Sequence, residues 1–211
     1  MTKVLLLGAG GQIARHVIDM LANDGDTEMT LFLRNASRIA SAPANARIVE
    51  GDVLDQTQLN AAVMKQDIVY ANLTGEDLDH QARTVLASMQ ATGVSRLVFV
   101  LSLGIYDEVP GAFGEWNRRT IGEGLKPFRR AADLIEASGL DYTIIRPAWL
   151  TDEDEIDYET TKKGEPFNGT VVSRKSVADL IAKIIQSPDS HILADLGINK
   201  PDTDADKPYF M

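Results

Sequence analysis

Short apolar runs alternate along the chain with segments whose apolar residues recur at helical spacing. Five runs are expected to be strands, at residues 3–7, 30–33, 47–50, 67–71 and 96–101, the first of them buried. Between the first two, a stripe that includes Ile13, Val17 and Leu21 places apolar side chains on one face of a helix. Strands that are apolar throughout and separated by helices are typical of a parallel sheet covered on both faces. The pattern therefore predicts an α/β fold.

Further elements complete the pattern, which becomes sparser toward the end of the chain. Helices are expected at 55–64, 82–93, 127–139 and 176–186, and a strand at 141–146. Gly93 and Pro147 are residue types that end a helix and a strand, respectively. The stretch 102–126 is rich in glycine and charge, so we expect a loop there. Little pattern follows residue 186, and residues 201–211 are expected to pack late or to fray.

Composition narrows the classes of function that the chain can serve. At about 150 residues per domain, a length of 211 residues favours a single domain. The chain has no cysteine, which excludes a disulfide, a thiolate metal site and a cysteine nucleophile. The net charge of −10 disfavours binding to nucleic acids and to anionic membranes. No metal site is expected either, because the acidic stretch 152–157 lacks the loop glycines of a calcium site.

The N-terminal apolar run does not predict export or membrane insertion. Residues 4–7 are apolar, but this run is shorter than the apolar core of a signal peptide. No other stretch approaches the ~18 apolar residues that a membrane span requires. We therefore expect a cytoplasmic protein.

A glycine-rich turn separates the first predicted strand from the first predicted helix, and contains Gly8, Gly10 and Gly11. Glycine permits the sharp reversal and lets the backbone approach a pyrophosphate, which unpaired amides at the helix N-terminus then bind. This strand–turn–helix setting is the one that a dinucleotide-binding fingerprint requires. We predict that the turn binds a dinucleotide together with Gln12 and Ile13. A tight turn without a ligand is the alternative; a nucleoside-triphosphate loop is excluded, because no Gly-Lys-Ser/Thr follows.

Charged residues after the second and third predicted strands indicate which dinucleotide binds. NAD enzymes usually carry an acidic residue after the second strand, where it binds the ribose 2′-hydroxyl. Arg34 stands there instead, with Arg38 close behind, and a guanidinium can bind the 2′-phosphate of NADP. We therefore predict that NADP(H) is preferred over NAD(H), the alternative being two surface arginines. Asp52, after the third strand, is expected near the adenine; the alternative is a capping or turn aspartate, and one residue can serve both roles.

Several motifs recur along nearly the whole chain in the order of a known family. They are Gly8-x-x-Gly11-x-x-Ala14, Leu33-Arg34-Asn35, Gly51-Asp52-Val53-Leu54-Asp55, Leu101-Ser102-Leu103-Gly104-Ile105-Tyr106, Ser138-Gly139-Leu140-Asp141-Tyr142-Thr143-Ile144-Ile145-Arg146-Pro147 and Val172-Ser173-Arg174-Lys175-Ser176-Val177-Ala178-Asp179. With these motifs the sequence resembles the atypical short-chain dehydrogenases/reductases, specifically the NmrA-like, NAD(P)H-binding group of small bacterial proteins.

The resemblance implies a Rossmann-type, doubly wound parallel sheet with a small C-terminal substrate lobe. Residues 1–150 would form the cofactor-binding sheet of one domain, and 151–211 the lobe with a C-terminal helix. In the family, the glycine turn holds the pyrophosphate and the arginine after the second strand holds the 2′-phosphate. The other implied contacts are Asp52 and Val53 at the adenine, Asn72 and Leu73 at the adenosine ribose, and Pro147, Ala148 and Trp149 at the nicotinamide end.

The family's catalytic residues are a serine and a Tyr-x-x-x-Lys pair, in which the tyrosine is the general acid. Ser102 stands at the serine position, but Leu125 and Arg129 stand at the tyrosine and lysine positions. Leucine cannot transfer a proton, so the pair is absent, although Arg129 could still bind ribose hydroxyls. Tyr106 is the nearest replacement acid, or else a surface tyrosine. Tyr158 is a further candidate, and His80 is the only histidine expected near a ligand.

These observations leave two functions open. The first is an oxidoreductase that passes a hydride from NADPH to a small conjugated acceptor such as a flavin or a quinone, which needs no enzymic tyrosine because it takes its proton from water. The second is a non-catalytic NADP(H) sensor that regulates a partner. An epimerase is less favoured, because epimerases of this superfamily generally keep the Tyr–Lys pair. The expected ligands are small molecules, and both a monomer and a dimer remain open.

Overall fold

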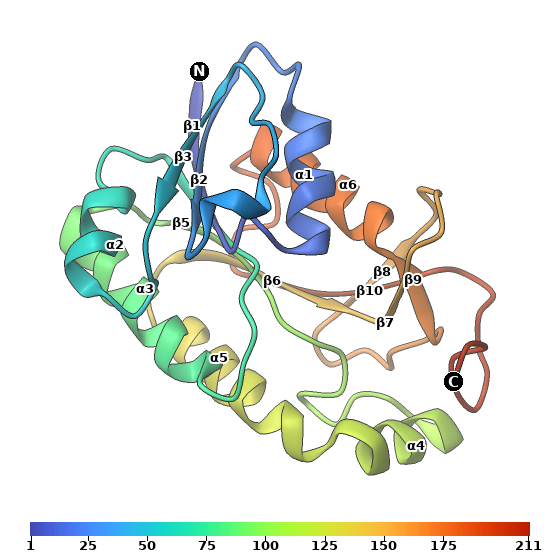
Figure 1. Ribbon diagram of the computed structural model, residues 1–211. Coiled ribbons are helices and arrows are strands. Elements are labelled where there is room, and N and C mark those ends of the chain that lie inside the picture. The colour runs from blue at the N-terminus through green and yellow to red at the C-terminus, as the bar shows by residue number, and fades with distance from the viewer.

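The computed structural model describes all residues, 1–211, and is built around one eight-stranded sheet (Figure 1). The strand order is β3-β2-β1-β4-β5-β6-β10-β8, and every pair is parallel except β10 with β8. The strands are β1 (Thr2–Leu7), β2 (Thr27–Leu33), β3 (Ala46–Glu50), β4 (Ile68–Ala71), β5 (Arg96–Val100), β6 (Asp141–Pro147), β8 (Glu159–Lys162) and β10 (Ala194–Asn199). The direction of winding changes between β1 and β4, which creates a crevice at their carboxyl ends.

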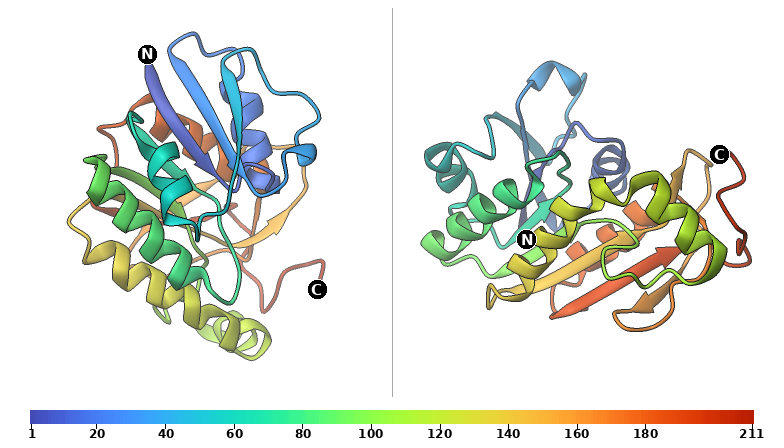
Figure 2. Two further views of the ribbon diagram at one scale, coloured as in Figure 1. Left: turned by 60° about the vertical axis from the view of Figure 1, so that its left-hand side comes forward. Right: turned by 90° about the horizontal axis from the view of Figure 1, so that it is seen from below.

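Helices cover both faces of this sheet, as the views in Figures 1 and 2 show. The helices are α1 (Gln12–Leu21), α2 (Gln56–Val63), α3 (Leu78–Thr92), α4 (Gly111–Ile121), α5 (Lys126–Glu136) and α6 (Arg174–Gln186), with short 3-10 turns η1 (Ala36–Arg38) and η2 (Glu123–Leu125). α1 and α6 pack on one face, and α2, α3 and α5 pack on the other. None of the helices has the length and apolar character that crossing a bilayer requires.

Two hydrophobic cores, one on each face, explain why the central strands are largely apolar, whereas the edge strand β3 is mostly exposed. On β1, Val4 and Leu6 belong to the core beneath α1 and α6, whereas Leu5 and Leu7 belong to the core beneath α2, α3 and α5. All four side chains are fully buried. The prediction of an α/β fold with a Rossmann-type parallel sheet is confirmed.

Most of the predicted elements are confirmed to within a few residues. Gly93 ends α3 in the left-handed conformation, with φ of +74°, and Pro127 lies in the first turn of α5. The expectation of a loop at 102–126 was wrong, because α4 and η2 form there. The first turn of α4 packs so closely that a Cβ on Gly114 would come within 1.9 Å of the Val109 carbonyl oxygen. Glycine makes this packing possible, although its composition had suggested a loop.

The C-terminal third of the chain is divided between the main sheet and a small addition. β10 lies beside β6 in the sheet and α6 packs against α1, so neither forms a separate lobe. The addition consists of a two-stranded sheet, β7 (Trp149–Thr151) with β9 (Val171–Ser173). The sparse pattern after residue 186 gave no prediction of β10. The tail that was expected to pack late or to fray is held at its start, where the Thr170 hydroxyl donates to the Thr203 carbonyl oxygen (2.7 Å).

Candidate functional site

The glycine turn after β1 is locked against the loop that follows β4. Gly8 has a φ of +74°, and a Cβ there would lie 2.2 Å from the Asn72 carbonyl oxygen. A Cβ on Gly11 would lie 2.3 Å from the Asn72 side-chain nitrogen. Gly10 differs, since its closest neighbour would be the Arg38 side chain, at 3.3 Å. Gly8 and Gly11 therefore let the turn and the β4–α3 loop meet.

The N-terminus of α1 faces this turn with free donors. Gly11 precedes the helix, and no side chain caps it. The amides of Gln12, Ile13 and Ala14 donate to no acceptor within the protein. Free amides at a helix N-terminus bind phosphate groups, aided by the helix dipole. A backbone cradle without side chains, together with these donors, fits the pyrophosphate of a dinucleotide.

Arg34 and Arg38 provide positive charge beside the cradle. Arg34 follows the end of β2, and Arg38 lies in η1, which the Asn35 side chain caps by accepting the Ser37 amide (3.0 Å). Both arginines are exposed, and neither takes part in any of the protein's ion pairs. Because they have no carboxylate partner, both guanidinium groups are available to an anion.

Asp52 and Val53 lie at the end of β3. The Asp52 carboxylate accepts the Leu54 amide (3.0 Å), and the Asp52 amide donates to the Gln58 side chain (3.1 Å). Asp52 is thus the turn residue that the sequence left open, and its second carboxylate oxygen remains available. Val53 is half-buried against the core beneath α2.

Ser102 lies at the carboxyl end of β5, between two backbone bonds to β6. The Leu101 amide donates to the Ile145 carbonyl oxygen (2.8 Å), and the Leu103 amide donates to the Pro147 carbonyl oxygen (3.2 Å). These bonds hold Ser102 beside Pro147 and Ala148. The half-buried Ser102 hydroxyl makes no hydrogen bond within the protein. The glycine turn, the Asn72–Leu73 loop and Ser102 thus follow one another along the carboxyl edge of the sheet, where ligands bind in open α/β folds.

Tyr106 and Arg129 both make side-chain hydrogen bonds within the protein. The Tyr106 hydroxyl lies within hydrogen-bond distance of Glu136 (2.8 Å) and Asp195 (2.8 Å). Because it has one hydrogen, the two carboxylates compete as acceptors of a single hydrogen bond. Burial, reinforced by the negative charge of Asp195, raises the pKa of Tyr106 well above its ordinary value. Arg129 pairs with Asp133 (2.9 Å), and its guanidinium lies over the Tyr106 ring, 4.9 Å from its centre. Leu125, at the position of the missing tyrosine, is buried just before α5 begins.

A buried arginine that the sequence did not single out supports the turn after Ser102. Arg146 is 1% exposed and pairs with Glu108 and Asp195. Glu108 also accepts the amides of Gly104 (2.9 Å) and Tyr106 (3.0 Å). Burial raises the pKa of Asp195, while Arg146 opposes the shift. The only signal in the sequence was a charged residue within an apolar strand.

The two remaining candidates lie elsewhere. The Tyr158 hydroxyl donates to the Asp179 carboxylate on α6 (2.8 Å). Burial, and to a lesser extent this hydrogen bond, raises the pKa of Tyr158. His80 is exposed on α3. Neither joins the residues at the carboxyl edge in any recorded hydrogen bond.

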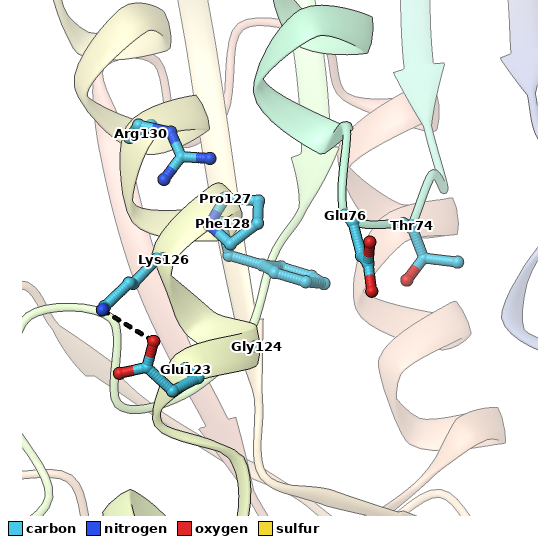
Figure 3. Close-up of a pocket in the computed structure, with 9 residues that line it drawn as sticks. Thr74, Glu76, Glu123, Gly124, Lys126, Pro127, Phe128 and Arg130 are labelled. Atoms are coloured by element: carbon cyan, nitrogen blue, oxygen red, sulfur yellow. Dashed lines mark hydrogen bonds and ion pairs between the residues drawn. The ribbon is translucent and has the colours of Figure 1, made fainter.

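A hollow of about 530 Å³ lies between the β4–α3 loop and the start of α5 (Figure 3). The Phe128 ring projects into it toward Thr74 and Glu76. Its cations are paired, Lys126 with Glu123 (2.7 Å) and Arg130 with Asp79 (2.7 Å). It is lined by Thr74, Gly75, Glu76, Glu123, Gly124, Lys126, Pro127, Phe128 and Arg130, and so contains none of the predicted site residues.

Comparison with known proteins identifies the family. The sequence model of an NAD(P)H-binding family matches residues 8–188, most of the chain. The chain belongs to this NAD(P)H-binding family. A Rossmann-fold NAD(P)-binding family protein from Shigella flexneri is 59% identical, with both chains covered completely and a TM-score of 0.87. A short-chain dehydrogenase/reductase from Veillonella parvula, solved in complex with NADP, is 26% identical over 99% of both chains, with a TM-score of 0.89.

One curated relative carries a different activity in its name. The uncharacterized sugar epimerase YhfK of Bacillus subtilis is 29% identical over 192 residues, which cover 83% of this chain and 79% of that protein. Family membership therefore establishes an NAD(P)-binding, oxidoreductase-type fold, and the reaction must be argued from the residues of the site.

Proposed function

We propose that this protein is an NADP(H)-dependent oxidoreductase that reduces a small conjugated acceptor such as a quinone or a flavin. The observation that carries the proposal is the open backbone cradle at Gly8–Ile13, with free amides and two unpaired arginines beside it. The similarity to a short-chain dehydrogenase/reductase solved with NADP supports the choice of cofactor.

Each residue along the carboxyl edge has a role in this proposal. The amides at the start of α1 bind the pyrophosphate, and Arg34 and Arg38 bind the 2′-phosphate. Asp52 and Val53 border the adenine, and Asn72 and Leu73 border the adenosine ribose. Ser102, Pro147 and Ala148 border the nicotinamide.

The proton requirement limits the choice of acceptor. When bound, NADPH supplies a hydride from its nicotinamide, and a quinone that takes this hydride and one proton becomes the hydroquinone. Leu125 cannot supply that proton, and the Tyr106 hydroxyl is held between two carboxylates. We therefore assign the proton to water, and to Ser102 the task of orienting the acceptor oxygen through its free hydroxyl. Tyr106 and Arg129 act as positioning residues that support the turn carrying Ser102.

Turnover tests the reaction directly. Purified protein and NADPH are mixed with a panel that includes menadione and flavin mononucleotide, and the loss of NADPH absorbance is followed. We expect oxidation that depends on both protein and acceptor. If NADPH binds but is not oxidised with any acceptor on the panel, the protein is not the oxidoreductase proposed.

Arginine variants test the cofactor preference. Charge-assisted bonds contribute about 1.5–3 kcal/mol, so Arg34→Ala or Arg38→Ala should raise the Kd for NADPH by about 10–100-fold. The Kd for NADH should change little, because NADH has no 2′-phosphate. An equal loss of affinity for NADH would show that the assignment of the 2′-phosphate is wrong.

A second function, an NADP(H) sensor, is favoured by the leucine at the tyrosine position and by the paired side chains of Tyr106 and Arg129. A sensor would bind NADPH and NADP+ with different affinities and would capture a partner only with one of them. Cofactor-dependent partner capture, combined with no turnover on the acceptor panel, would favour the sensor.

A further inference from the structure

The two tryptophans of the chain lie together beside the proposed nicotinamide end. Trp149 begins β7, two residues after Pro147, and Trp116 comes from α4. Their ring centres are 5.0 Å apart, with planes tilted by 56°, and Phe113 stacks on Trp116 with ring centres 6.1 Å apart. We call Trp116 and Trp149 the tryptophan pair.

The tryptophan pair is fixed to the turn that carries Ser102. The Trp149 indole N–H donates to the Asn117 side-chain oxygen (2.9 Å), and Asn117 is 1% exposed. A Cβ on Gly104 would come within 2.7 Å of the Asn117 side-chain nitrogen. Asn117 thus links Trp149 to the backbone two residues after Ser102. Trp149 and the turn that carries Ser102 therefore both contact Asn117.

The exposure of the pair is uneven. Phe113 and Asn117, its neighbours on α4, are buried, whereas Trp116 and Trp149 are only half-buried. The indole N–H of Trp149 is already satisfied, so what it leaves exposed is aromatic surface rather than a polar group in need of water. Rigid, partly exposed aromatic side chains beside convergent polar groups are typical of binding sites for flat ligands.

We propose that the tryptophan pair stacks against the conjugated ring of the acceptor and selects planar acceptors over aliphatic carbonyl compounds. The inference rests on the proposed oxidoreductase function and deepens it, because it assigns the acceptor-binding side chains. It places the acceptor ring at α4 and β7, next to Ser102. The alternative place is the hollow around Phe128, whose lining does not include Ser102.

Fluorescence of the wild-type protein tests the contact without any substitution. Because the two tryptophans are the only ones, indole emission reports on this pair alone. The protein is saturated with NADP+, titrated with menadione, and corrected for absorbance with a free tryptophan amide standard. We expect saturable quenching that removes more than about half of the emission, since a stacked ring contacts the indoles directly. Quenching that stays linear and equals that of the standard would overturn the proposal.

Kinetics with matched variants tests the role in acceptor binding. An aromatic contact is worth a factor of about five to ten, so Trp116→Ala should raise KM for menadione by that factor and leave kcat within about twofold. Trp116→Phe keeps a stacking ring and should restore KM to within about twofold of wild type. Phe128→Ala, which removes the aromatic ring of the hollow, should leave KM unchanged. An unchanged KM in Trp116→Ala, or a raised KM in Phe128→Ala, would overturn the proposal.

Two further readings separate the possible failures. Thermal unfolding of each variant shows whether it is folded; if Trp116→Ala is not folded, the fluorescence titration of the wild-type protein decides. If the wild-type protein oxidises NADPH, but quenching is linear and KM is unchanged in Trp116→Ala, the tryptophan pair does not bind the acceptor and the proposed function stands. If wild type oxidises no acceptor, the proposed function fails, and linear quenching by menadione would then reject the pair as well.

Discussion

Replacing Gly8 with alanine tests whether the glycine turn has the conformation described here. At a φ of +74° an L-residue is less stable than glycine by about 1–2 kcal/mol, so Gly8→Ala loses this conformational free energy. Its Cβ would also lie 2.2 Å from the Asn72 carbonyl oxygen, in a backbone segment held by the bond from the Asn72 amide to the Leu7 carbonyl oxygen. Relieving this overlap should cost a further ~1–3 kcal/mol of unfolding free energy. The variant should lose about 2–5 kcal/mol of unfolding free energy.

Gly93→Ala provides a matched control for this experiment. Gly93 has the same φ of +74°, but a Cβ there would meet no atom within 4 Å. It should therefore lose only the conformational part, about 1–2 kcal/mol. Gly93 lies at the end of α3, away from the cradle, so the Kd for NADPH should not change.

Urea unfolding and a titration with NADPH provide the two readouts. Gly8→Ala should unfold at lower urea than Gly93→Ala, and should bind NADPH about tenfold more weakly or worse, because the displaced turn no longer presents its backbone to the pyrophosphate. If Gly8→Ala matched Gly93→Ala in both stability and affinity, the clash with Asn72 would not exist and the turn would not be the cradle.

Two further predictions concern the buried polar groups. Burial raises the pKa of Tyr70 and Tyr106 above their ordinary value of 10.0, so the stability that their bound protons contribute is complete below about pH 10 and is lost as the pH rises further. Native protein should therefore show no tyrosinate absorbance from these two residues before it unfolds in alkali, and a spectrum with five tyrosinates in folded protein would be inconsistent with this. Arg146→Leu leaves Glu108 and Asp195 buried without their cation and should cost about 3–5 kcal/mol in urea unfolding; a loss below about 1 kcal/mol would mean that this network does not stabilise the fold.

Local patterns in the sequence predicted the sheet and the glycine turn. The central strands of the sheet are buried on both faces, so each appears in the sequence as an apolar run that can be recognised without knowing which strands lie beside it. The glycine turn could be recognised because its requirement is local: a strand, a reversal and a helix follow one another within a few residues. Asn72 could be assigned only through the family resemblance, since its contact with Gly8 and Gly11 spans more than sixty residues of chain.

The rest of the site depends on contacts between distant residues. Asp195 lies on β10, whose mixture of polar and apolar residues has no clear strand pattern, and it is buried because Arg146 and Tyr106 meet it there. The same contact explains why Tyr106, which resembles a free acid in the sequence, has its hydroxyl occupied. α4 was missed because its glycines suggested a loop, although Gly114 is what allows the helix to pack. Missing α4 also concealed the proximity of Trp116 to Trp149.

A calorimetric titration of the wild-type protein with NADPH and, separately, with NADH tests the proposed NADP(H) site most directly. The free amides of the cradle and the two unpaired arginines predict one site per chain and a Kd for NADPH that is lower by about tenfold or more. NADPH at about one hundred times its Kd should also stabilise the fold by about 2.7 kcal/mol. If neither nucleotide binds, or if NADH binds as tightly as NADPH, the proposed NADP(H) site is contradicted.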